Sequence, residues 1–455
     1  MEREKRGNLW TAMAHIVTAL IGSSALALAW TFAQLGWVAG PVVLIGFSGV
    51  TYCTSAFLAD CYRYPDPVTG APNREFIDAV RCSLGPRKAL WCAIVQYANI
   101  WATLVGYTVT TTASASAMHK VACAHRKGLV DGSSCSTPGG WGLYLMAAFC
   151  AIQVLLSQLP NLESISWISF GSVGSSFVYS SISLGLCIAK WASHGNFRGT
   201  LNGATASSPT DKFFNIFLAI GNIATAYAYM DILIEIQDTI KSPPSERKTM
   251  KRASLYGLSI STLFYLLLGL AGCAALGNDA PGNILDGVAF HEPFWLVDIA
   301  NACVVVHFLT AYQVFAQPVF ARLEGYVSSQ WPGSWFVNAN YNVHVPMTST
   351  AAISLTPMKL TLRTAVIVLT TLVAGLLPFF NAVLGLLGAI GFWPLSVYFP
   401  VSMHIARLKI RRAQPRWWML QAMSLCCLLI SVGITAASIK DIANNLKKSK
   451  PFESN

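Results

Sequence analysis

The stretch His15-Ile16-Val17-Thr18-Ala19-Leu20-Ile21-Gly22-Ser23-Ser24-Ala25-Leu26-Ala27-Leu28-Ala29-Trp30 is apolar enough for a membrane helix, but small residues interrupt it at Gly22. About half a chain away, Gly221 interrupts a second apolar stretch, Phe217-Leu218-Ala219-Ile220-Gly221-Asn222-Ile223-Ala224-Thr225-Ala226-Tyr227-Ala228-Tyr229. Lipid cannot hydrogen-bond the backbone groups that a helix break frees, so breaks are tolerated only inside protein or beside a wet cavity. Paired breaks are typical of secondary transporters. The alternative is that the small residues only let helices approach closely.

The composition is typical of a polytopic membrane protein. Over 455 residues, hydrophobic side chains make up 54% and charged side chains only 11%. A helix needs about 20 mainly apolar residues to cross a bilayer, and the sequence predicts an all-α chain with eleven such spans. The predicted spans are residues 10–37, 39–62, 89–118, 141–159, 164–191, 213–238, 254–276, 293–320, 358–378, 381–400 and 417–439.

The distribution of charge predicts the orientation of these spans. Lys and Arg are concentrated in the segments that are cytosolic if the N-terminus is cytosolic, as the positive-inside rule requires. We therefore expect the net charge of +11 to face anionic lipid headgroups and not nucleic acid. One membrane domain is predicted, with a cytosolic tail at 1–9, a membrane core at 10–439 and a C-terminal tail at 440–455. Met1–Arg6 carries no cleavage site, so the first span is expected to be an uncleaved anchor.

The segments outside the spans are short. Residues 322–357 lack the apolar periodicity of a separate domain, and Arg74–Leu84 has the apolar side of a surface helix. Cys123 and Cys135 fall in a predicted outer loop at 119–140, where an oxidising exterior allows a disulfide, with two free thiols as the alternative. No Cys and His residues have metal-site spacing, so no metal is predicted.

Several long motifs resemble the plant amino acid permeases, which belong to the amino acid/auxin permease family. These motifs are Gly7-Asn8-Leu9-Trp10-Thr11-Ala12-Met13-Ala14-His15-Ile16, Ala33-Gln34-Leu35-Gly36-Trp37-Val38-Ala39-Gly40-Pro41, Leu58-Ala59-Asp60-Cys61-Tyr62-Arg63, Leu233-Ile234-Glu235-Ile236-Gln237-Asp238-Thr239, Gly277-Asn278-Asp279-Ala280-Pro281-Gly282-Asn283, Ala311-Tyr312-Gln313-Val314-Phe315 and Phe392-Trp393-Pro394-Leu395. The resemblance covers nearly the whole chain.

The resemblance implies a fold and an activity. The fold is that of the amino acid–polyamine–organocation superfamily, with two inverted repeats of five helices and with the first and sixth helices broken. The implied activity is proton-driven amino acid import at the plasma membrane, with the N-terminus in the cytosol. It needs no enzyme chemistry and no cofactor beyond the proton gradient. The sequence does not predict an oligomeric state.

Broken helices suit a zwitterionic substrate, because the N-terminus of a half-helix attracts a carboxylate and the carbonyl end of another attracts an ammonium. The candidates for the carboxylate are Gly22, Ser23, Ser24 and Ala25. The candidates for the ammonium are carbonyls near Gly221 and Asn222. Four residues are assigned to recognise the side chain of the substrate, and packing is their alternative role. They are Tyr107, Thr225, Tyr227 and Tyr312.

The chain departs from the family at both predicted breaks. Ser24 stands where relatives usually have Gly, and a Cβ there would cost about 1 kcal/mol if the backbone needed a positive φ. Asn222 stands where relatives usually have an acid, so a titratable group is lost. A new acid, Asp231, lies nine residues later and cannot take its place. Proton coupling and substrate preference are therefore both open.

Proton coupling needs a group that titrates within the membrane. His15 and His307 match histidines of the family and are the candidates, because an imidazole ordinarily titrates at a pH of about 6.5. A neutral packing role is the alternative for each. Other ionisable groups are assigned other roles. Glu235 and Asp238 are expected either to form a gate or to lie at a solvated helix end. Asp298 is expected to form a structural pair, and His404 is expected at the membrane interface.

Three other classes of membrane protein are alternatives to a symporter. A channel would show a repeated filter motif, and a membrane enzyme would show a catalytic constellation; the sequence has neither. An amino acid sensor built on a transporter scaffold would keep the binding site and lose coupling. The loss of the acid at Asn222 keeps that alternative open.

Overall fold

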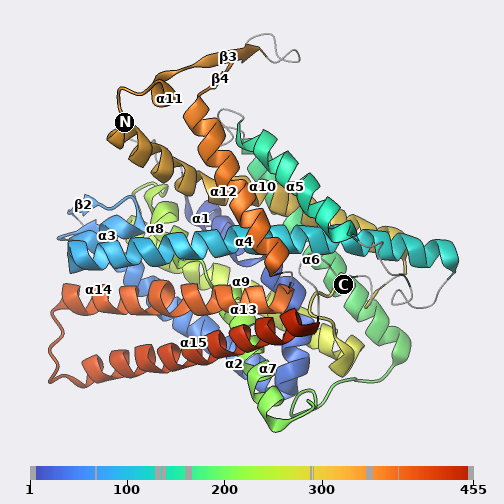
Figure 1. Cartoon of the computed structure of the whole chain (residues 1–455). Coiled ribbons are helices and arrows are strands. Elements are labelled where there is room, and N and C mark those ends of the chain that lie inside the picture. Colours follow the sequence, from blue (N-terminus) through green and yellow to red (C-terminus); the bar gives the residue numbers. More distant parts are fainter. Residues whose placement is uncertain are drawn as a thin grey trace. The chain divides into compact units, whose positions relative to one another are not determined.

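The structure is a computed structural model, and it describes residues 7–66, 69–128, 135, 140–158, 166–286, 289–290, 292–344, 352–377 and 379–448. Helices account for nearly all of the secondary structure in these ranges (Figure 1). The helices are α1 Leu9–Leu20, α2 Ser23–Asp60, α3 Phe76–Leu84, α4 Pro86–Lys127, α5 Trp141–Ser157, α6 Ser166–His194, α7 Pro209–Ala226, α8 Met230–Asp238, α9 Glu246–Leu276, α10 Phe294–Gln330, α11 Trp335–Asn338, α12 Pro357–Leu376, α13 Phe380–Gly391, α14 Phe399–Leu408 and α15 Pro415–Lys448.

A few short elements complete the fold. A 3₁₀ turn, η3 Gly277–Asp279, follows α9, and a π-helical segment, η4 Phe392–Tyr398, joins α13 to α14. The strands form two antiparallel hairpins, and they are β1 Arg63–Tyr64 with β2 Ala71–Pro72 and β3 Tyr341–His344 with β4 Ala352–Leu355.

The chain forms two compact units, each assembled from segments that are distant in the sequence. The first contains residues 1–99, 183–284 and 381–444, and the second contains residues 100–182, 285–380 and 445–455. Both interrupted stretches of the sequence belong to the first unit. That the two units make up one membrane domain stays a prediction.

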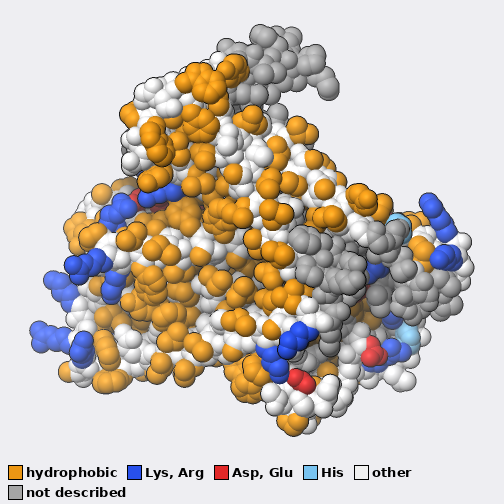
Figure 2. Space-filling view, viewed as in Figure 1, with side chains coloured by type: hydrophobic (Ala, Val, Ile, Leu, Met, Phe, Trp, Pro, Cys, Tyr) orange, Lys and Arg blue, Asp and Glu red, His pale blue; other side chains and the backbone are white. Residues whose placement is uncertain are grey.

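In the described parts of the chain, each of the eleven predicted spans is mostly helical. Within the described residues, eight helical segments are long and apolar enough to cross a membrane, and α1 and α5 are shorter apolar helices. Large hydrophobic side chains remain exposed on these helices, for example Trp418, Met419 and Leu429 on α15. Figure 2 shows hydrophobic side chains over much of the viewed face, with Lys and Arg where the loop between α14 and α15 lies. A bilayer accommodates such a surface.

The first two predicted spans meet at a kink and not at a loop. Helix α2 continues from the second half of the first span into the second span, and Gly36 interrupts it with φ 85° and ψ 175°. A Cβ on Gly36 would lie 2.3 Å from the Leu201 carbonyl oxygen, and Ala204 N donates to Ala33 O at 2.8 Å beside the kink. Only glycine meets both the positive φ and this close backbone approach.

The first predicted break is confirmed. Helix α1 ends at Leu20 and α2 begins at Ser23; between them Ile21 is extended and Gly22 has φ −136° and ψ −148°, which is not helical. Ser24 lies in the first turn of α2, and Lys409 is the only described residue other than glycine with a positive φ. The backbone cost that a positive φ would bring at Ser24 therefore does not arise, because this position has helical dihedrals.

The predicted position of the second break was wrong. Helix α7 runs through Gly221 and Asn222 to Ala226, and the chain leaves the helix at Tyr227 before α8 begins at Met230. The sixth span is broken as expected, but the break lies six residues after Gly221. Tyr227, Ala228 and Tyr229 occupy it, and not Gly221 and Asn222.

Close helix packing explains the glycine at 221. A Cβ there would lie 2.6 Å from Ile434 Cγ2 and 2.9 Å from the Gly385 Cα. A Cβ on Gly388 would in turn lie 2.3 Å from the Gly221 carbonyl oxygen. Small residues at these positions let α7, α13 and α15 approach one another, which is the alternative reading of the interrupted stretch.

Three other segments differ from expectation. Cys123 lies in the last turns of α4, not in a loop, and forms a disulfide with Cys135; residues 129–134 and 136–139 of the predicted outer loop lie outside the described residues. Helix α15 continues to Lys448, so the first part of the predicted C-terminal tail is helical. Residues 322–357 include the end of α10, α11 and a hairpin. The predicted surface helix is present as α3, with Phe76, Ala79 and Val80 on its buried side.

The packing at Gly221 gives a stability prediction. Gly221→Ala should destabilise the protein by about 1–3 kcal/mol, because the added methyl group overlaps Ile434 and the α13 backbone. Thermal unfolding of the purified protein in detergent measures the loss. The matched control is Gly46→Ala in α2, where an added Cβ meets nothing within 4 Å; its midpoint should not fall. Equal midpoints for Gly221→Ala and the unsubstituted protein would contradict the packing assignment.

The disulfide gives a second prediction. Cys123→Ser or Cys135→Ser should reduce the amount of protein at the cell surface more than the affinity for substrate, because neither residue lies near the helix breaks in the chain. Surface biotinylation and substrate affinity, measured on the same cells, separate the two effects. Labelling of both cysteines by an impermeant thiol reagent without reductant would show that the bond does not form.

Candidate functional site

The first break has helix ends of both kinds. The Leu20 carbonyl lies at the C-terminal end of α1, where no further turn of helix can supply a donor. Gly22 is the N-cap of α2, and no side chain caps that helix. The first N–H groups of α2 therefore carry the positive end of a helix dipole, which favours an anion. Gly22, Ser23, Ser24 and Ala25 all lie at this end, as the sequence predicts.

The second break exposes a similar pair of helix ends. Ala226 is the last residue of α7, and the turn after it uses Tyr227 N to Ala224 O at 3.3 Å and Ala228 N to Thr225 O at 3.1 Å. Helix α8 starts at Met230 without a side-chain cap, and it carries Asp231 in its first turn. The acid therefore lies at the positive end of a half-helix, where a carboxylate is stabilised.

One side chain joins the carbonyl ends of the two breaks. The Tyr265 hydroxyl of α9 donates to Leu20 O through a very short hydrogen bond and lies 3.5 Å from Ala226 O. Tyr265 is fully buried, and the ring of Tyr227 lies against it edge-on with centroids 6.0 Å apart. The two breaks therefore lie next to each other within the first unit.

Glycines on α9 hold this helix against both halves of the first broken helix. A Cβ on Gly257 would lie 2.8 Å from Ile16 Cγ2 on α1, and one on Gly272 would lie 2.5 Å from the Ala29 Cβ on α2. Tyr265 lies between these glycines in the sequence of α9. The sequence prediction missed Tyr265, although this spacing of small residues along an apolar helix signals a close helix contact.

Asn222 and Thr225 make contacts inside the helix packing and not at a break. Asn222 Nδ2 lies 3.3 Å from both Thr31 Oγ1 and Asn381 Oδ1, and its own Oδ1 is buried without a hydrogen-bond partner in the described structure. Thr225 Oγ1 lies 2.6 Å from Leu384 O and 3.1 Å from Gly221 O. These side chains join α7 to α2 and to α13.

The three tyrosines of the predicted site divide between the two units. Tyr227, in the first unit, is fully buried and its hydroxyl lies 2.8 Å from Thr262 Oγ1. Tyr107 and Tyr312 belong to the second unit. Tyr312 is fully buried, with its hydroxyl 2.6 Å from Thr370 Oγ1, and Tyr107 packs against Phe308 with ring centroids 4.9 Å apart.

The two candidate histidines have different environments. His307 in α10 is buried, and its Nδ1 lies 2.9 Å from the Ser172 carbonyl oxygen. A carbonyl can only accept, so Nδ1 carries a proton and Nε2 is the atom that can gain or lose one. His15 lies on an exposed face of α1.

Charged side chains gather at one end of the first unit. Asp60, at the end of α2, lies 2.5 Å from Arg247 Nε, 2.7 Å from Lys251 Nζ and 3.9 Å from Arg407. The same end contains His404, whose Nε2 accepts from Arg416 at 3.0 Å. These residues lie where the sequence predicts cytosolic segments.

A second set of polar contacts lies close in sequence to this cluster. Arg63 pairs with Glu246 at 2.7 Å, and the Tyr62 hydroxyl donates to Asp238 at 2.7 Å. Burial and the Asp238 carboxylate raise the pKa of Tyr62, so the hydroxyl stays a donor. Asp238 is therefore paired, and the prediction of a gate between Asp238 and an inner-loop Lys or Arg stays a prediction.

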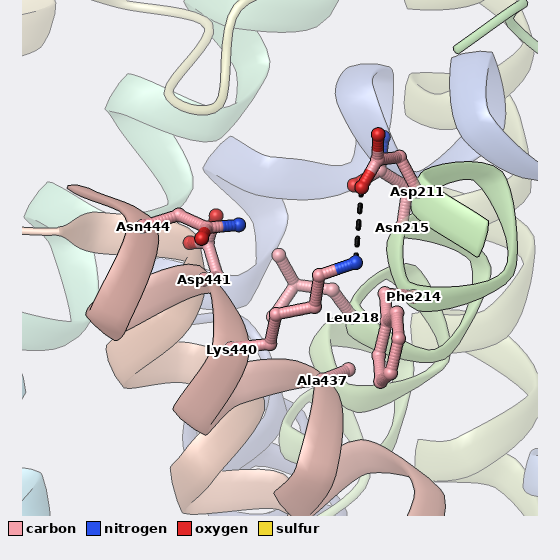
Figure 3. Close-up of a pocket in the computed structure, with 8 residues that line it drawn as sticks. All are labelled: Asp211, Phe214, Asn215, Leu218, Ala437, Lys440, Asp441 and Asn444. Carbon is pink, nitrogen blue, oxygen red and sulfur yellow. Dashed lines mark hydrogen bonds and ion pairs between the residues drawn. The ribbon is translucent and has the colours of Figure 1, made fainter. Parts of the chain in front are cut away.

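A small pocket lies at the other end of α7, away from the breaks. Figure 3 shows its lining, in which Lys440 of α15 reaches toward α7. Lys440 Nζ lies 2.9 Å from Asp211 Oδ1 and 4.1 Å from the centre of the Phe214 ring. Because its lysine is already held by a carboxylate and a ring, this pocket is a weaker substrate site than the breaks.

Comparison with known proteins places the chain among transporters. The family model described as transmembrane amino acid transporter protein matches residues 5–442. The chain is 48% identical to amino acid permease 6 of Arabidopsis thaliana, over 99% of this chain and 94% of the relative. It is 47% identical to amino acid permease 3 of the same plant, over 100% of this chain and 94% of the relative.

Solved structures with low sequence identity share the fold. MhsT in complex with L-phenylalanine matches with a TM-score of 0.54 at 12% identity, over 96% of this chain and 100% of that chain. Mhp1, a nucleobase-cation-symport-1 family transporter in a closed conformation with bromovinylhydantoin bound, matches with a TM-score of 0.51 at 14% identity, over 100% and 96%. The predicted all-α, polytopic transporter fold is therefore confirmed.

Proposed function

Because the chain belongs to the transmembrane amino acid transporter family, we propose that it imports amino acids together with protons across the plasma membrane, with its N-terminus in the cytosol. The observation that carries the proposal is the pair of adjacent helix breaks, joined at Tyr265. The helix ends at these breaks carry partial charges of both signs, so one end attracts the carboxylate of a zwitterion and the others attract its ammonium.

Each end of the substrate has a matching helix end. The carboxylate is assigned to the uncapped N-terminus of α2, at Gly22, Ser23 and Ser24. The ammonium is assigned to the carbonyl ends of α1 and α7, at Leu20 and Ala226, in place of the carbonyls near Gly221 that the sequence predicts. Gly221 and Asn222 lie inside a continuous helix, where the backbone carbonyls are used by the helix itself.

Selectivity for the side chain is assigned first to Tyr227, which borders the second break. Tyr107 and Tyr312 lie in the other unit, and their assignment to the substrate rests on the sequence. Thr225 is a weaker candidate, because its hydroxyl lies within hydrogen-bond distance of two backbone carbonyls.

His307 is the stronger of the two coupling candidates. Its Nδ1 is fixed on the Ser172 carbonyl, so a proton would enter and leave at Nε2. Its burial makes the charged form costly unless a second event compensates, which links protonation to conformation. His15 is proposed alongside it on the family position alone.

The specific alternative is a sensor or uncoupled facilitator that binds amino acids without using protons. Asn222 favours it, because an amide cannot release a proton and here it is fully buried. In that alternative the helix breaks bind substrate, but no group in the first unit couples binding to the proton gradient.

Uptake into proteoliposomes tests the proposal. Radiolabelled alanine should accumulate when the outside is acidic and should only equilibrate when the two sides have equal pH. His307→Gln and His15→Asn should each flatten the dependence of initial uptake rate on external pH before they abolish binding, because neither new side chain titrates.

The matched control for these variants is His194→Gln at the exposed C-terminal end of α6, where the histidine lies 2.8 Å from the Lys190 carbonyl. Its pH profile should be that of the unsubstituted protein. Alanine that binds but never accumulates above equilibrium would reject coupled import and favour the sensor. An unchanged pH profile in His307→Gln would reject His307 as a coupling group.

Restoring the acid at position 222 gives a separate prediction. Asn222→Asp places a carboxyl group between Thr31 and Asn381, which can hydrogen-bond its charged form. Proton dependence of uptake should become stronger, as measured by the ratio of rates in acidic and neutral external buffer. If the unsubstituted protein binds without accumulation and Asn222→Asp creates it, the sensor alternative is supported.

A further inference from the structure

Tyr265 has a position that no other described tyrosine has, at the meeting point of two half-helix ends. Its hydroxyl contacts the last carbonyl of α1 and lies 3.5 Å from the last carbonyl of α7. The side chain comes from a third, unbroken helix, and it is fully buried. The contact is therefore a fixed feature of the interior of the first unit.

The backbone hydrogen bonds at the two breaks show why the Tyr265 hydroxyl matters. Val17 O accepts from Ile21 N at 2.9 Å, and Ala224 O and Thr225 O accept from the turn after α7. Leu20 O and Ala226 O, the last carbonyls of α1 and α7, are not acceptors in these turns, and both lie against the Tyr265 hydroxyl. A buried carbonyl without a donor is costly, and most of all where no water reaches it.

A phenol carries one proton and cannot satisfy both carbonyls. The shorter contact, to Leu20 O, takes the proton, and the contact to Ala226 O is only a long approach of 3.5 Å. A substrate ammonium has three N–H donors and lacks acceptors. Ala226 O and the second lone pair of Leu20 O are acceptors of the matching kind, and the Tyr265 hydroxyl lies against both carbonyls.

We propose that Tyr265 is a positioning residue for the ammonium group of the substrate, which holds the carbonyl ends of α1 and α7 together so that both carbonyls can accept from the ammonium. This inference rests on the proposed function. It assigns to α9, an unbroken helix, a role in recognising the amino group. The neighbouring Thr262, which links Tyr227 to Ser48 of α2, holds the same face of α9 against the second break.

The experiment compares two substrates in Tyr265→Phe. Binding of alanine to the purified protein should become about tenfold weaker, since the hydroxyl that aligns the two carbonyls is lost. N-methylalanine has one N–H fewer than alanine, so the unsubstituted protein should prefer alanine. In Tyr265→Phe this preference should shrink, because carbonyls that are no longer aligned distinguish three N–H groups from two less well. General damage to the fold would weaken both ligands equally and leave the preference unchanged.

Two controls make the result decisive. Thr435→Val in α15 removes a half-buried hydroxyl that bonds only its own helix, at Ser431 O, and should leave both affinities unchanged. If Tyr265→Phe does not fold, Tyr265→His keeps a ring and an N–H donor, and its alanine preference is measured instead.

The outcomes separate this inference from the proposed function. A folded Tyr265 variant with an unchanged preference for alanine overturns the role of Tyr265, while alanine binding by the unsubstituted protein still supports the proposed function. If the unsubstituted protein binds no amino acid at all, the proposed function and the inference that rests on it both fail.

Discussion

A backbone group freed inside a membrane must find a partner in the protein, and the interior of the first unit is organised around this constraint. Two helices stop in mid-span, and each leaves a terminal carbonyl that its own turns do not use. An unbroken helix, α9, brings a single hydroxyl to both of them. Because one hydroxyl contacts both terminal carbonyls, the two breaks must lie next to each other.

The same constraint explains where small residues occur. The close approach of α9 to both halves of the first broken helix needs glycine at 257 and 272, since any side chain would collide with Ile16 or Ala29. Gly221 and Gly388 likewise let α7 and α13 pack closely. Without these contacts Tyr265 could not reach the breaks. In a membrane, where apolar surface alone does not drive helices together, close packing of small residues takes over that role.

Charged side chains of the first unit lie at its ends and at a few interior positions. Asp60 is surrounded by Arg247 and Lys251 at the end where cytosolic segments are predicted, and Lys440 and Asp211 pair at the opposite end of α7. Between these ends, Asn222 makes neutral hydrogen bonds to Thr31 and Asn381, at a position where the resemblance of the sequence to plant permeases implies an acid. Coupling to protons would then depend on groups elsewhere, and His307, with one nitrogen fixed on a carbonyl and the other able to titrate, is the best-placed one described.

The sequence by itself determined the all-α membrane fold, the approximate spans and the break at Gly22, because apolar length and small polar interruptions are local properties of the chain. It did not determine the break at Tyr227, since glycine that ends a helix and glycine that admits a neighbouring helix look alike in one chain. Only the tertiary structure distinguished them, through the atoms of Ile434 and Gly385 that lie against Gly221. The role of Tyr265 could not be predicted for the same reason. It depends on two carbonyls that lie 245 and 39 residues away in the sequence. Only the packing of three helices brings these carbonyls to one hydroxyl.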